Sequence, residues 1–212
     1  MTVTEAPRDA ALEAAAAPSP SAPPTGLAAV VGSGDPRTIG KLFVGTSLLF
    51  LLAAGVIGVL TGVEVYDSTG SEIFAADTLP RMVTLQATGA LFLGVLPLLL
   101  GLATAVVPLQ VGAATVAFPR ATAAAYWTWL VSGALVIAAY GIDGGPFGRD
   151  VDAVSLYVAA LVAVIVALAV ATISVVTTVA TLRAPGMTLR RTPLFSWSVL
   201  VGGSVWLLTL PV

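Results

Sequence analysis

The sequence has no cysteine and no histidine, and only 9% of its 212 residues are charged. Without cysteine there are no disulfides, no thiolate chemistry and no Cys/His zinc sites. Without histidine no imidazole can act as a general base or as a ligand of haem or copper. Nine basic residues and a net charge of −2 argue against nucleic acid as a partner. Because a soluble domain carries about a quarter charged residues, the shortage of charge also excludes an ordinary water-soluble globule.

The chain is rich in apolar residues: 58% of it is hydrophobic, and its mean hydropathy is +1.01. A helix of about 22 residues is about 33 Å long, which matches a hydrocarbon core of about 30 Å. The composition therefore predicts an all-α, multi-pass transmembrane bundle of five helices, the last at the short end of the range. The uncharged stretches that predict these spans cover residues 42–63, 82–107, 123–142, 154–182 and 195–212.

Residues 1–36 differ from the rest of the chain. They are rich in alanine, proline, serine and glycine and contain no aromatic residue. Such a segment cannot bury enough apolar surface to offset its ordering entropy, so we expect a disordered tail ahead of a membrane domain over residues 37–212. The segment does not read as a signal peptide, because prolines interrupt it and no leucine-rich core follows a basic start.

The charges alternate from loop to loop. Seven of the nine basic residues fall in the tail and in the second and fourth loops, and seven of the eleven acids fall in the first and third loops. Basic residues stay on the cytoplasmic side during insertion, so we expect the amino terminus inside and the carboxyl terminus outside a cell membrane. The alternation fits five spans and fails with four or six. No Asp, Glu, Lys or Arg lies inside a predicted span, which weakens a transporter interpretation.

Local features within the spans carry further expectations. Gly58 and Gly62 have the small-xxx-small spacing of close helix contacts, although glycine is also simply common in membrane helices. Pro97 should kink the second span and free a carbonyl near residue 93. Hydroxyls over residues 172–178 could line a polar path or bond to their own helix. Aromatic residues near predicted span ends fit an interfacial belt; they are Tyr126, Trp127, Trp129 and Trp197.

Three stretches go beyond generic membrane signals. They are Asp35-Pro-Arg-Thr-Ile-Gly-Lys-Leu-Phe over residues 35–43, Pro-Leu-Gln-Val-Gly-Ala-Ala-Thr-Val-Ala-Phe-Pro-Arg over 108–120, and Leu-Arg-Ala-Pro-Gly-Met-Thr over 182–188. In order and spacing they resemble subunit I of the haem-copper oxidases, the cytochrome c oxidase family. The resemblance covers about residues 35–212 and reaches only the first five of about twelve helices in that family. It implies a plasma-membrane protein of aerobic respiration and electron transport, and the alanine-rich tail favours a bacterial source.

The positions that carry chemistry in that family differ here. The resemblance places Gln86 where the family has a histidine ligand of the low-spin haem, and an amide is a poor iron ligand. It places Gly62 at an arginine close to that haem. Thr115 takes the place of an aspartate at the mouth of a proton channel, and Thr122 that of an asparagine further along. We therefore expect neither bound haem nor bound copper, with Gln86 forming an interhelical hydrogen bond or marking an altered cofactor site.

The basic residues of the inner loops allow two interpretations each. Arg120 fits a topology anchor that caps helix carbonyls, or a contact for a partner. Arg183, Arg190 and Arg191 fit the positive-inside rule or the binding of anionic headgroups. The outer acids Glu64, Asp67, Glu72 and Asp77 form a solvated face or an attractive surface for a basic partner.

Three functions follow from these observations. The first is a non-catalytic accessory or assembly component of a respiratory oxidase, in effect a pseudoenzyme. The second is one half of a split catalytic subunit, and the third a small transporter or lipid-binding protein that reuses the fold. The resemblance implies a ring of about twelve helices that five helices cannot close, so we expect a homo-oligomer or a complex with other oxidase subunits, surrounded by membrane lipid.

Overall fold

The computed structural model describes residues 32–66, 74–75 and 77–210. The predicted tail therefore falls almost wholly outside the described residues, as do Asp67 and Glu72. All elements below belong to the unit Ser33–Val212. The tail boundary at residue 36 stays a prediction.

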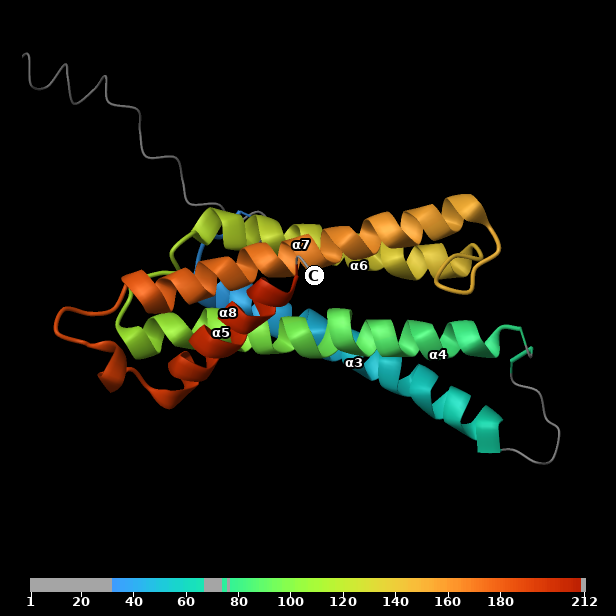
Figure 1. The fold of residues 1–212 in the computed structure, drawn as a ribbon, viewed down its shortest axis with the longest axis horizontal. Coiled ribbons are helices and arrows are strands. Elements are labelled where there is room, and N and C mark those ends of the chain that lie inside the picture. Colours follow the sequence, from blue (N-terminus) through green and yellow to red (C-terminus); the bar gives the residue numbers. More distant parts are fainter. Residues whose placement is uncertain (1–31, 67–73, 76, 211–212) are drawn as a thin grey trace, which may run out of the picture. The chain divides into compact units, whose positions relative to one another are not determined.

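The described residues confirm a helical bundle with five principal rods, each an uninterrupted helical segment (Figure 1). The second rod is continuous but changes helix type twice along its length. Four rods are long and apolar enough to cross a membrane, while the last has 16 residues and is shorter. The elements are α3 (Pro36–Tyr66), α4 (Leu79–Thr88), the π-helical η1 (Gly89–Val95), α5 (Leu96–Val111), α6 (Pro119–Gly141), α7 (Val151–Thr181), the 3₁₀ turn η2 (Leu189–Arg191) and α8 (Leu194–Thr209).

The rods begin and end where the sequence offers the expected signals. Pro119 opens α6, and the Asp150 carboxylate caps α7 by accepting a hydrogen bond from the Ala153 amide at 2.8 Å. Gly112 ends α5 in the left-handed conformation with φ of 72°, which glycine adopts without strain. The ends of the rods therefore lie within a few residues of the ends of the apolar stretches that predict them.

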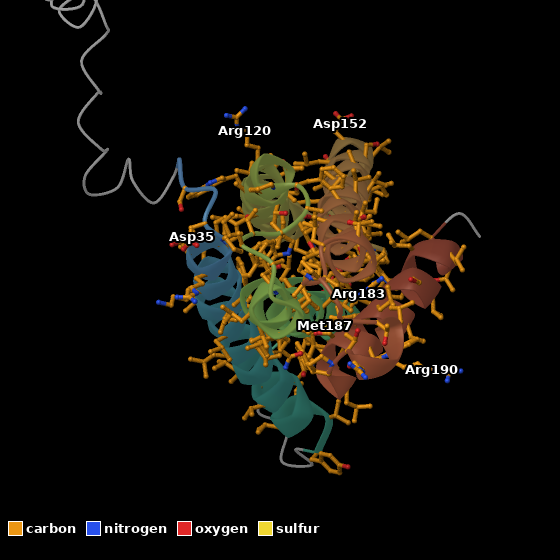
Figure 2. All side chains as sticks on the ribbon, turned by 90° about the vertical axis from the view of Figure 1, so that its left-hand side faces the viewer. Asp35, Arg120, Asp152, Arg183, Met187 and Arg190 are labelled. Atoms are coloured by element: carbon orange, nitrogen blue, oxygen red, sulfur yellow. The ribbon has the colours of Figure 1, made fainter. Side chains whose placement is uncertain are left out.

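Consecutive rods run antiparallel, so the ends of the bundle differ in charge (Figure 1). One end, here called the basic end, holds the start of α3, the α5–α6 loop and the α7–α8 loop, and Figure 2 looks toward it. The opposite acidic end holds Glu64, Asp77, Asp143, Asp150 and Asp152. The basic residues of the basic end, among those described, are Arg37, Lys41, Arg120, Arg183, Arg190 and Arg191.

An aromatic cluster forms the centre of the core. Trp129 is fully buried and Tyr126 is 2% exposed. The Phe43 ring lies 5.0 Å from the Tyr126 ring and 5.4 Å from the Trp129 ring, so the cluster joins α3 to α6. The prediction of an interfacial belt is wrong for Tyr126 and Trp129, because α3 covers this face of α6. Trp197 is half-buried near the basic end, where its indole donates to the Leu189 carbonyl at 2.6 Å.

Pro97 acts on the second rod through a change of helix type. The helix preceding it is π-helical, and the Leu96 amide bonds to the Leu91 carbonyl five residues back. In that register the missing Pro97 amide leaves the Phe92 carbonyl without its helical donor, which agrees with the predicted free carbonyl near residue 93. The indole of Trp129 donates to this Phe92 oxygen at 3.1 Å. A donor from α6 thus satisfies the carbonyl that the proline frees.

The close contact between α3 and α5 depends on glycines other than the predicted pair. A β-carbon on Gly101 would lie 2.6 Å from the Phe43 β-carbon, and one on Gly40 would lie 2.7 Å from the Gly101 carbonyl oxygen. By contrast, a β-carbon on Gly62 would meet nothing within 4 Å, and one on Gly58 would meet only Gln86. The Gly58–Gly62 spacing therefore does not mark a helix-to-helix backbone contact.

Asp35 caps α3 and supplies a prediction. Its carboxylate accepts hydrogen bonds from the Thr38 amide at 3.0 Å and the Thr38 hydroxyl at 2.8 Å. Replacing Asp35 with alanine should lower the free energy of unfolding in detergent by about 1 kcal/mol, the usual effect of losing such a cap.

The stabilisation by Asp35 should depend on pH. Burial would raise the pKa of its carboxyl, but the hydrogen bonds from Thr38 and the charge of Arg37 outweigh burial and lower that pKa below its ordinary value. A lowered folded-state pKa means that the stabilisation is complete above the unfolded pKa of about 4 and is lost as the pH falls through the folded value. The difference between wild type and Asp35→Ala should therefore shrink below about pH 4. A difference that stays constant down to pH 2.5, roughly, would contradict this assignment.

Candidate functional site

Gln86 lies on α4 about 10 Å from the start of that helix, in the half of the bundle near the acidic end. Its side chain covers Gly58 of α3: the amide nitrogen is 3.1 Å, and the side-chain carbons 3.4 and 3.5 Å, from where a Gly58 β-carbon would be. The hydrogen bonds among the described residues include none from the Gln86 amide. The predicted interhelical hydrogen bond is therefore wrong, and Gln86 instead fills the gap between two helices by van der Waals contact.

The residues around Gln86 do not fit a haem with an axial protein ligand. The position offers an amide, the chain has no imidazole, and the Gln86 side chain occupies the space beside Gly58. Gly62, one turn further along α3, offers no side chain in place of an arginine. The described residues also contain no group of three or more His, Cys, Asp or Glu side chains that could hold a metal ion.

Thr122 lies in a second region, at the basic end, and joins α6 to α7. Its hydroxyl oxygen is 2.8 Å from the Ser174 hydroxyl oxygen and 3.0 Å from the Phe118 carbonyl oxygen. Thr122 and Ser174 are both fully buried. The structure does not bring Thr122 together with Gln86, because Thr122 lies in the first turn of α6 at the basic end and Gln86 lies on α4 toward the acidic end.

The α5–α6 loop before Thr122 is fixed to α7 by two hydroxyls. The Ala117 amide donates to Thr178 Oγ at 2.8 Å, and the Phe118 amide donates to Ser174 Oγ at 3.2 Å. Thr178 also donates to the Ser174 carbonyl of its own helix at 2.7 Å. Thr115, in the same loop, is half-buried and has no hydrogen bond among the described residues. Where the resemblance places a proton-channel mouth, Thr115 thus offers an uncharged hydroxyl, while the buried α7 hydroxyls that fix the loop, Ser174 and Thr178, already bond to protein groups.

Ser174 and Thr178 bond to the α5–α6 loop, and Ser174 also bonds to Thr122, but sequence reasoning did not single out either residue. Both lie in the hydroxyl stretch over residues 172–178, and their i, i+4 spacing puts them on one face of α7. The expectation that these hydroxyls bond to their own helix is correct for Thr172 and Thr178. The expectation does not include their bonds to the α5–α6 loop, because nothing in the local sequence identifies a hydroxyl as the acceptor for an amide 61 residues away.

The second and third motif stretches, residues 108–120 and 182–188, meet at the basic end. The Ser196 hydroxyl of α8 donates to Gln110 Oε1 of α5 at 2.7 Å, and the Ala184 amide donates to the Val111 carbonyl at 2.8 Å. A β-carbon on Gly112 would lie 2.9 Å from the Ala184 β-carbon. These residues therefore specify how the ends of α5, α7 and α8 fit together.

The arginines of the basic end differ in their contacts and exposure. Arg183 caps the end of α7, where its Nη1 donates to the Val179 carbonyl at 2.6 Å and the Ala180 carbonyl at 2.8 Å. Arg120 is the second residue of α6 and is exposed (Figure 2), so the predicted capping of helix carbonyls is wrong for Arg120 and is carried by Arg183 instead. Arg190 and Arg191 are exposed in η2.

At the acidic end, both basic residues are paired. Arg81 forms an ion pair with Asp143 and donates to the Tyr140 carbonyl at 2.8 Å, which ties the start of α4 to the end of α6. Arg149 lies 3.4 Å from the Asp77 carboxylate. Asp77 is therefore a partner of Arg149 rather than only part of a solvated acidic face.

Comparison with known proteins gives a consistent result. Residues 38–212 match the family described as cytochrome c and quinol oxidase polypeptide I. The chain is 31% identical to the probable cytochrome c oxidase subunit 1-beta of Nocardia farcinica, over 100% of this chain and 39% of that protein. It is 31% identical to the putative cytochrome c oxidase subunit 1-beta of Streptomyces coelicolor, over 84% of this chain and 33% of that protein.

A more distant organism supplies a third relative. The chain is 32% identical to the heme-copper oxidase subunit I+III of Aeropyrum pernix, over 78% of this chain and 22% of that protein. The sequence thus spans 22–39% of the length of these curated relatives.

Proposed function

The chain belongs to the cytochrome c and quinol oxidase polypeptide I family, and on that premise we propose that it is a non-catalytic accessory or assembly component of an aerobic respiratory oxidase complex. It is a membrane protein with helices apolar enough to span a bilayer. In the proposal, the basic end faces the cytoplasm, in accord with the positive-inside rule. Other oxidase subunits are its partners.

The observation that carries the proposal is the packing of Gln86. A haem-binding position needs a strong axial ligand and an open space for the ring. Here an amide lies at that position and covers Gly58, and the described residues show it making packing contacts only. Contacts with α6 nevertheless hold the second rod in place. The Trp129 indole of α6 donates to the second rod, and Arg81 at the start of the second rod donates to the end of α6.

A second observation points the same way. The inner residues that the resemblance associates with proton uptake carry no charge, and Thr122 belongs to a buried hydroxyl network that fixes a loop. Because charge gathers protons at a channel mouth, uncharged and already bonded hydroxyls do not supply that function. The residues of this region support the fold, which is what an accessory protein needs in order to present a family-like surface to oxidase subunits.

The proposal predicts a specific result in cells. A tagged copy of the chain, purified from native membranes in mild detergent, should bring down oxidase subunits identified by mass spectrometry. Deleting its gene should lower the amount of assembled oxidase, measured from the haem absorption of the membranes. Both the wild-type chain and Gln86→Leu should restore that amount equally, because the Gln86 side chain serves only as packing.

Two outcomes would overturn the proposal. One is stoichiometric haem in the purified chain, shown by a Soret band that Gln86→Leu removes. The other is a deletion strain with an unchanged amount of oxidase, together with recovery of the chain free of oxidase subunits.

A further inference from the structure

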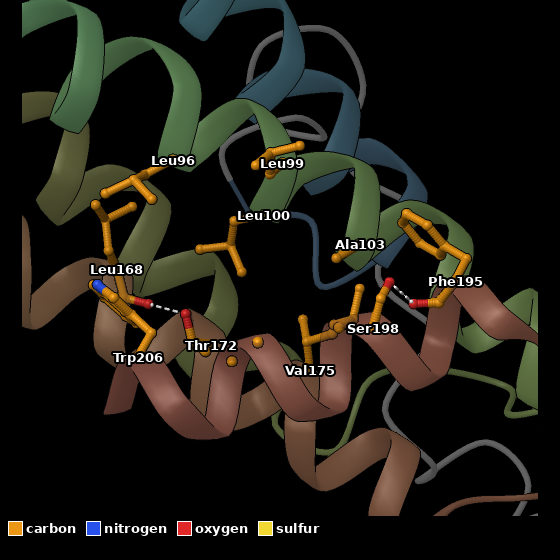
Figure 3. A pocket seen from close by; sticks show the side chains of 13 residues that line it. Leu96, Leu99, Leu100, Ala103, Leu168, Thr172, Val175, Phe195, Ser198 and Trp206 are labelled. Atoms are coloured by element: carbon orange, nitrogen blue, oxygen red, sulfur yellow. Dashed lines mark hydrogen bonds between the residues drawn. The ribbon is translucent and has the colours of Figure 1, made fainter. Parts of the chain in front are cut away.

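An apolar groove of about 360 Å³ lies between α5, α7 and α8 (Figure 3). Leu99 and Leu100 line it from α5, and Val175 lines it from α7. Phe195 and Trp206 of α8 lie at its two ends. The groove is separate from Gln86 and from the hydroxyl network of the α5–α6 loop, since it includes none of their residues.

The walls of the groove are mainly hydrocarbon, and among the described residues that line it the Trp206 indole N–H is the one side-chain donor that forms no hydrogen bond. Its two hydroxyl groups already donate to carbonyls of their own helices: Thr172 to Leu168 at 2.8 Å and Ser198 to Phe195 at 2.7 Å (Figure 3). An occupant therefore needs apolar surface, and a polar molecule would lose its hydration without compensation.

Two neighbouring glycines of α8 shape the groove. A β-carbon on Gly203 would lie 2.7 Å from Val176 Cγ2 of α7, so this glycine lets the two helices approach closely. A β-carbon on Gly202 would meet nothing within 4 Å. Open space therefore lies beside Gly202, and a larger side chain at that position would extend into the groove without displacing a helix.

The length and depth of the groove match one leaflet of a bilayer. Phe195 and Trp206 are eleven residues apart on one helix, which corresponds to about 17 Å. Half of a hydrocarbon core is about 15 Å. Because α8 starts at the basic end of the bundle, the groove begins at that membrane surface and ends near the bilayer centre.

Positive charge lies where the groove meets the surface. Arg190 and Arg191 form part of η2, immediately before α8, and both are exposed. Neither forms an ion pair among the described residues, and Figure 2 shows Arg190 directed away from the bundle. Arg183 differs, since its guanidinium already bonds to carbonyls at the end of α7.

We propose that this groove holds an acyl chain of an anionic phospholipid, with the headgroup bound by Arg190 and Arg191. Charge complementarity selects the headgroup, and the apolar walls along one leaflet accept the chain. Each arginine near an anionic surface contributes about 1 kcal/mol, so two should favour an anionic over a zwitterionic lipid about 30-fold. This site does not depend on the proposed accessory function.

Trp206 provides the measurement. The full chain is reconstituted into phosphatidylcholine vesicles that contain an increasing fraction of lipid brominated along the acyl chains, either phosphatidylglycerol or phosphatidylcholine. Bromine quenches indole fluorescence at contact, and the Trp206 contribution is the difference between wild type and Trp206→Phe. Fitted as competition with the unbrominated phosphatidylcholine, quenching of Trp206 should give an affinity about 30-fold higher for phosphatidylglycerol than for phosphatidylcholine.

Matched variants separate the headgroup from the groove. Arg190→Gln with Arg191→Gln should abolish the preference, whereas Arg37→Gln with Lys41→Gln removes the same charge from α3 at the same end and should keep it. Gly202→Leu fills the groove and should reduce Trp206 quenching by both lipids. Gly45→Leu adds the same side chain to an open position on α3 and should not.

Three outcomes would overturn the proposal. The first is equal quenching by both brominated lipids in the wild type. The second is a loss of lipid preference in the α3 double variant as large as that in the η2 double variant. The third is a Trp206 that neither lipid quenches while crosslinking shows a dimer through α8, which would assign the groove to a second copy of the chain.

Discussion

Replacing Trp129 with alanine is expected to lower the free energy of unfolding by about 3–5 kcal/mol, the range for deleting a large buried aromatic side chain. Trp129 is fully buried and packs against Phe43 and Phe50 of α3. Its indole is also the donor for the Phe92 carbonyl beside the π-helical segment. The alanine variant therefore loses packing between α3 and α6 and leaves a carbonyl unpaired inside the membrane.

Trp129→Phe separates these two contributions. It keeps most of the ring packing but removes the donor, so the expected loss is about 1–3 kcal/mol for an unsatisfied carbonyl. Unfolding in mixed micelles with increasing denaturing detergent, followed by circular dichroism, measures both variants. Trp206→Phe serves as the control, because Trp206 is only half-buried and forms no hydrogen bond among the described residues. A Trp129→Phe variant as stable as the wild type would show that Trp129 contributes through packing alone.

The second large effect is expected at Gly101. A β-carbon there would lie 2.6 Å from the Phe43 β-carbon and 3.0 Å from the Gly40 carbonyl oxygen. Since the Gly40 atom belongs to the backbone and the Phe43 atom is fixed to it, side-chain rotation cannot relieve the clash. Gly101→Val must separate α3 from α5, and we expect a loss of about 3 kcal/mol, the upper end for overpacking.

Gly45→Val is the matched control for this prediction. Gly45 lies on α3 near the same contact, but a β-carbon on it would meet nothing within 4 Å. The same detergent titration should find the control within about 0.5 kcal/mol of wild type. If the two valine variants were equally stable, the close contact at Gly40 and Gly101 would not be a determinant of the fold.

The existence and order of the helices could be predicted from the sequence because lipid imposes strong constraints. A span needs about 20 apolar residues, and the loops between spans must carry the charges. The stretch 82–107 accordingly lies inside the rod Leu79–Val111, and the stretch 154–182 lies inside the rod Val151–Thr181 except for its last residue. The resemblance to haem-copper oxidase subunit I is confirmed by the match over residues 38–212.

The contacts between helices could not be predicted in the same way. Composition places Trp129 near a span end, but only the position of α3 decides whether lipid or Phe43 surrounds it. Gly58 and Gly101 are equally small, and only the crossing of α3 and α5 makes Gly101 the contact. The π-helical register at Pro97 depends on a partner for Phe92 that comes from another helix.

The candidate site shows the same division. The resemblance places Gln86, Thr115 and Thr122 at positions that carry chemistry in the family, and it does so from sequence alone. That Gln86 covers Gly58 and that Thr122 bonds to Ser174 requires the arrangement of α3, α4, α6 and α7 in space.

The attachment of the α5–α6 loop to α7 also sets an order of events during synthesis. The acceptors for the Ala117 and Phe118 amides are hydroxyls 61 and 56 residues further along the chain. At about 5–20 residues per second, a ribosome needs roughly 3–12 s to make that stretch. For that time the loop is already joined to inserted helices while its two amides have only water as a partner. Once Ser174 and Thr178 have been synthesised, their hydroxyls accept the two amide hydrogen bonds and the loop is fixed to α7. An insertion factor or protease that binds this segment therefore has a defined interval in which to act.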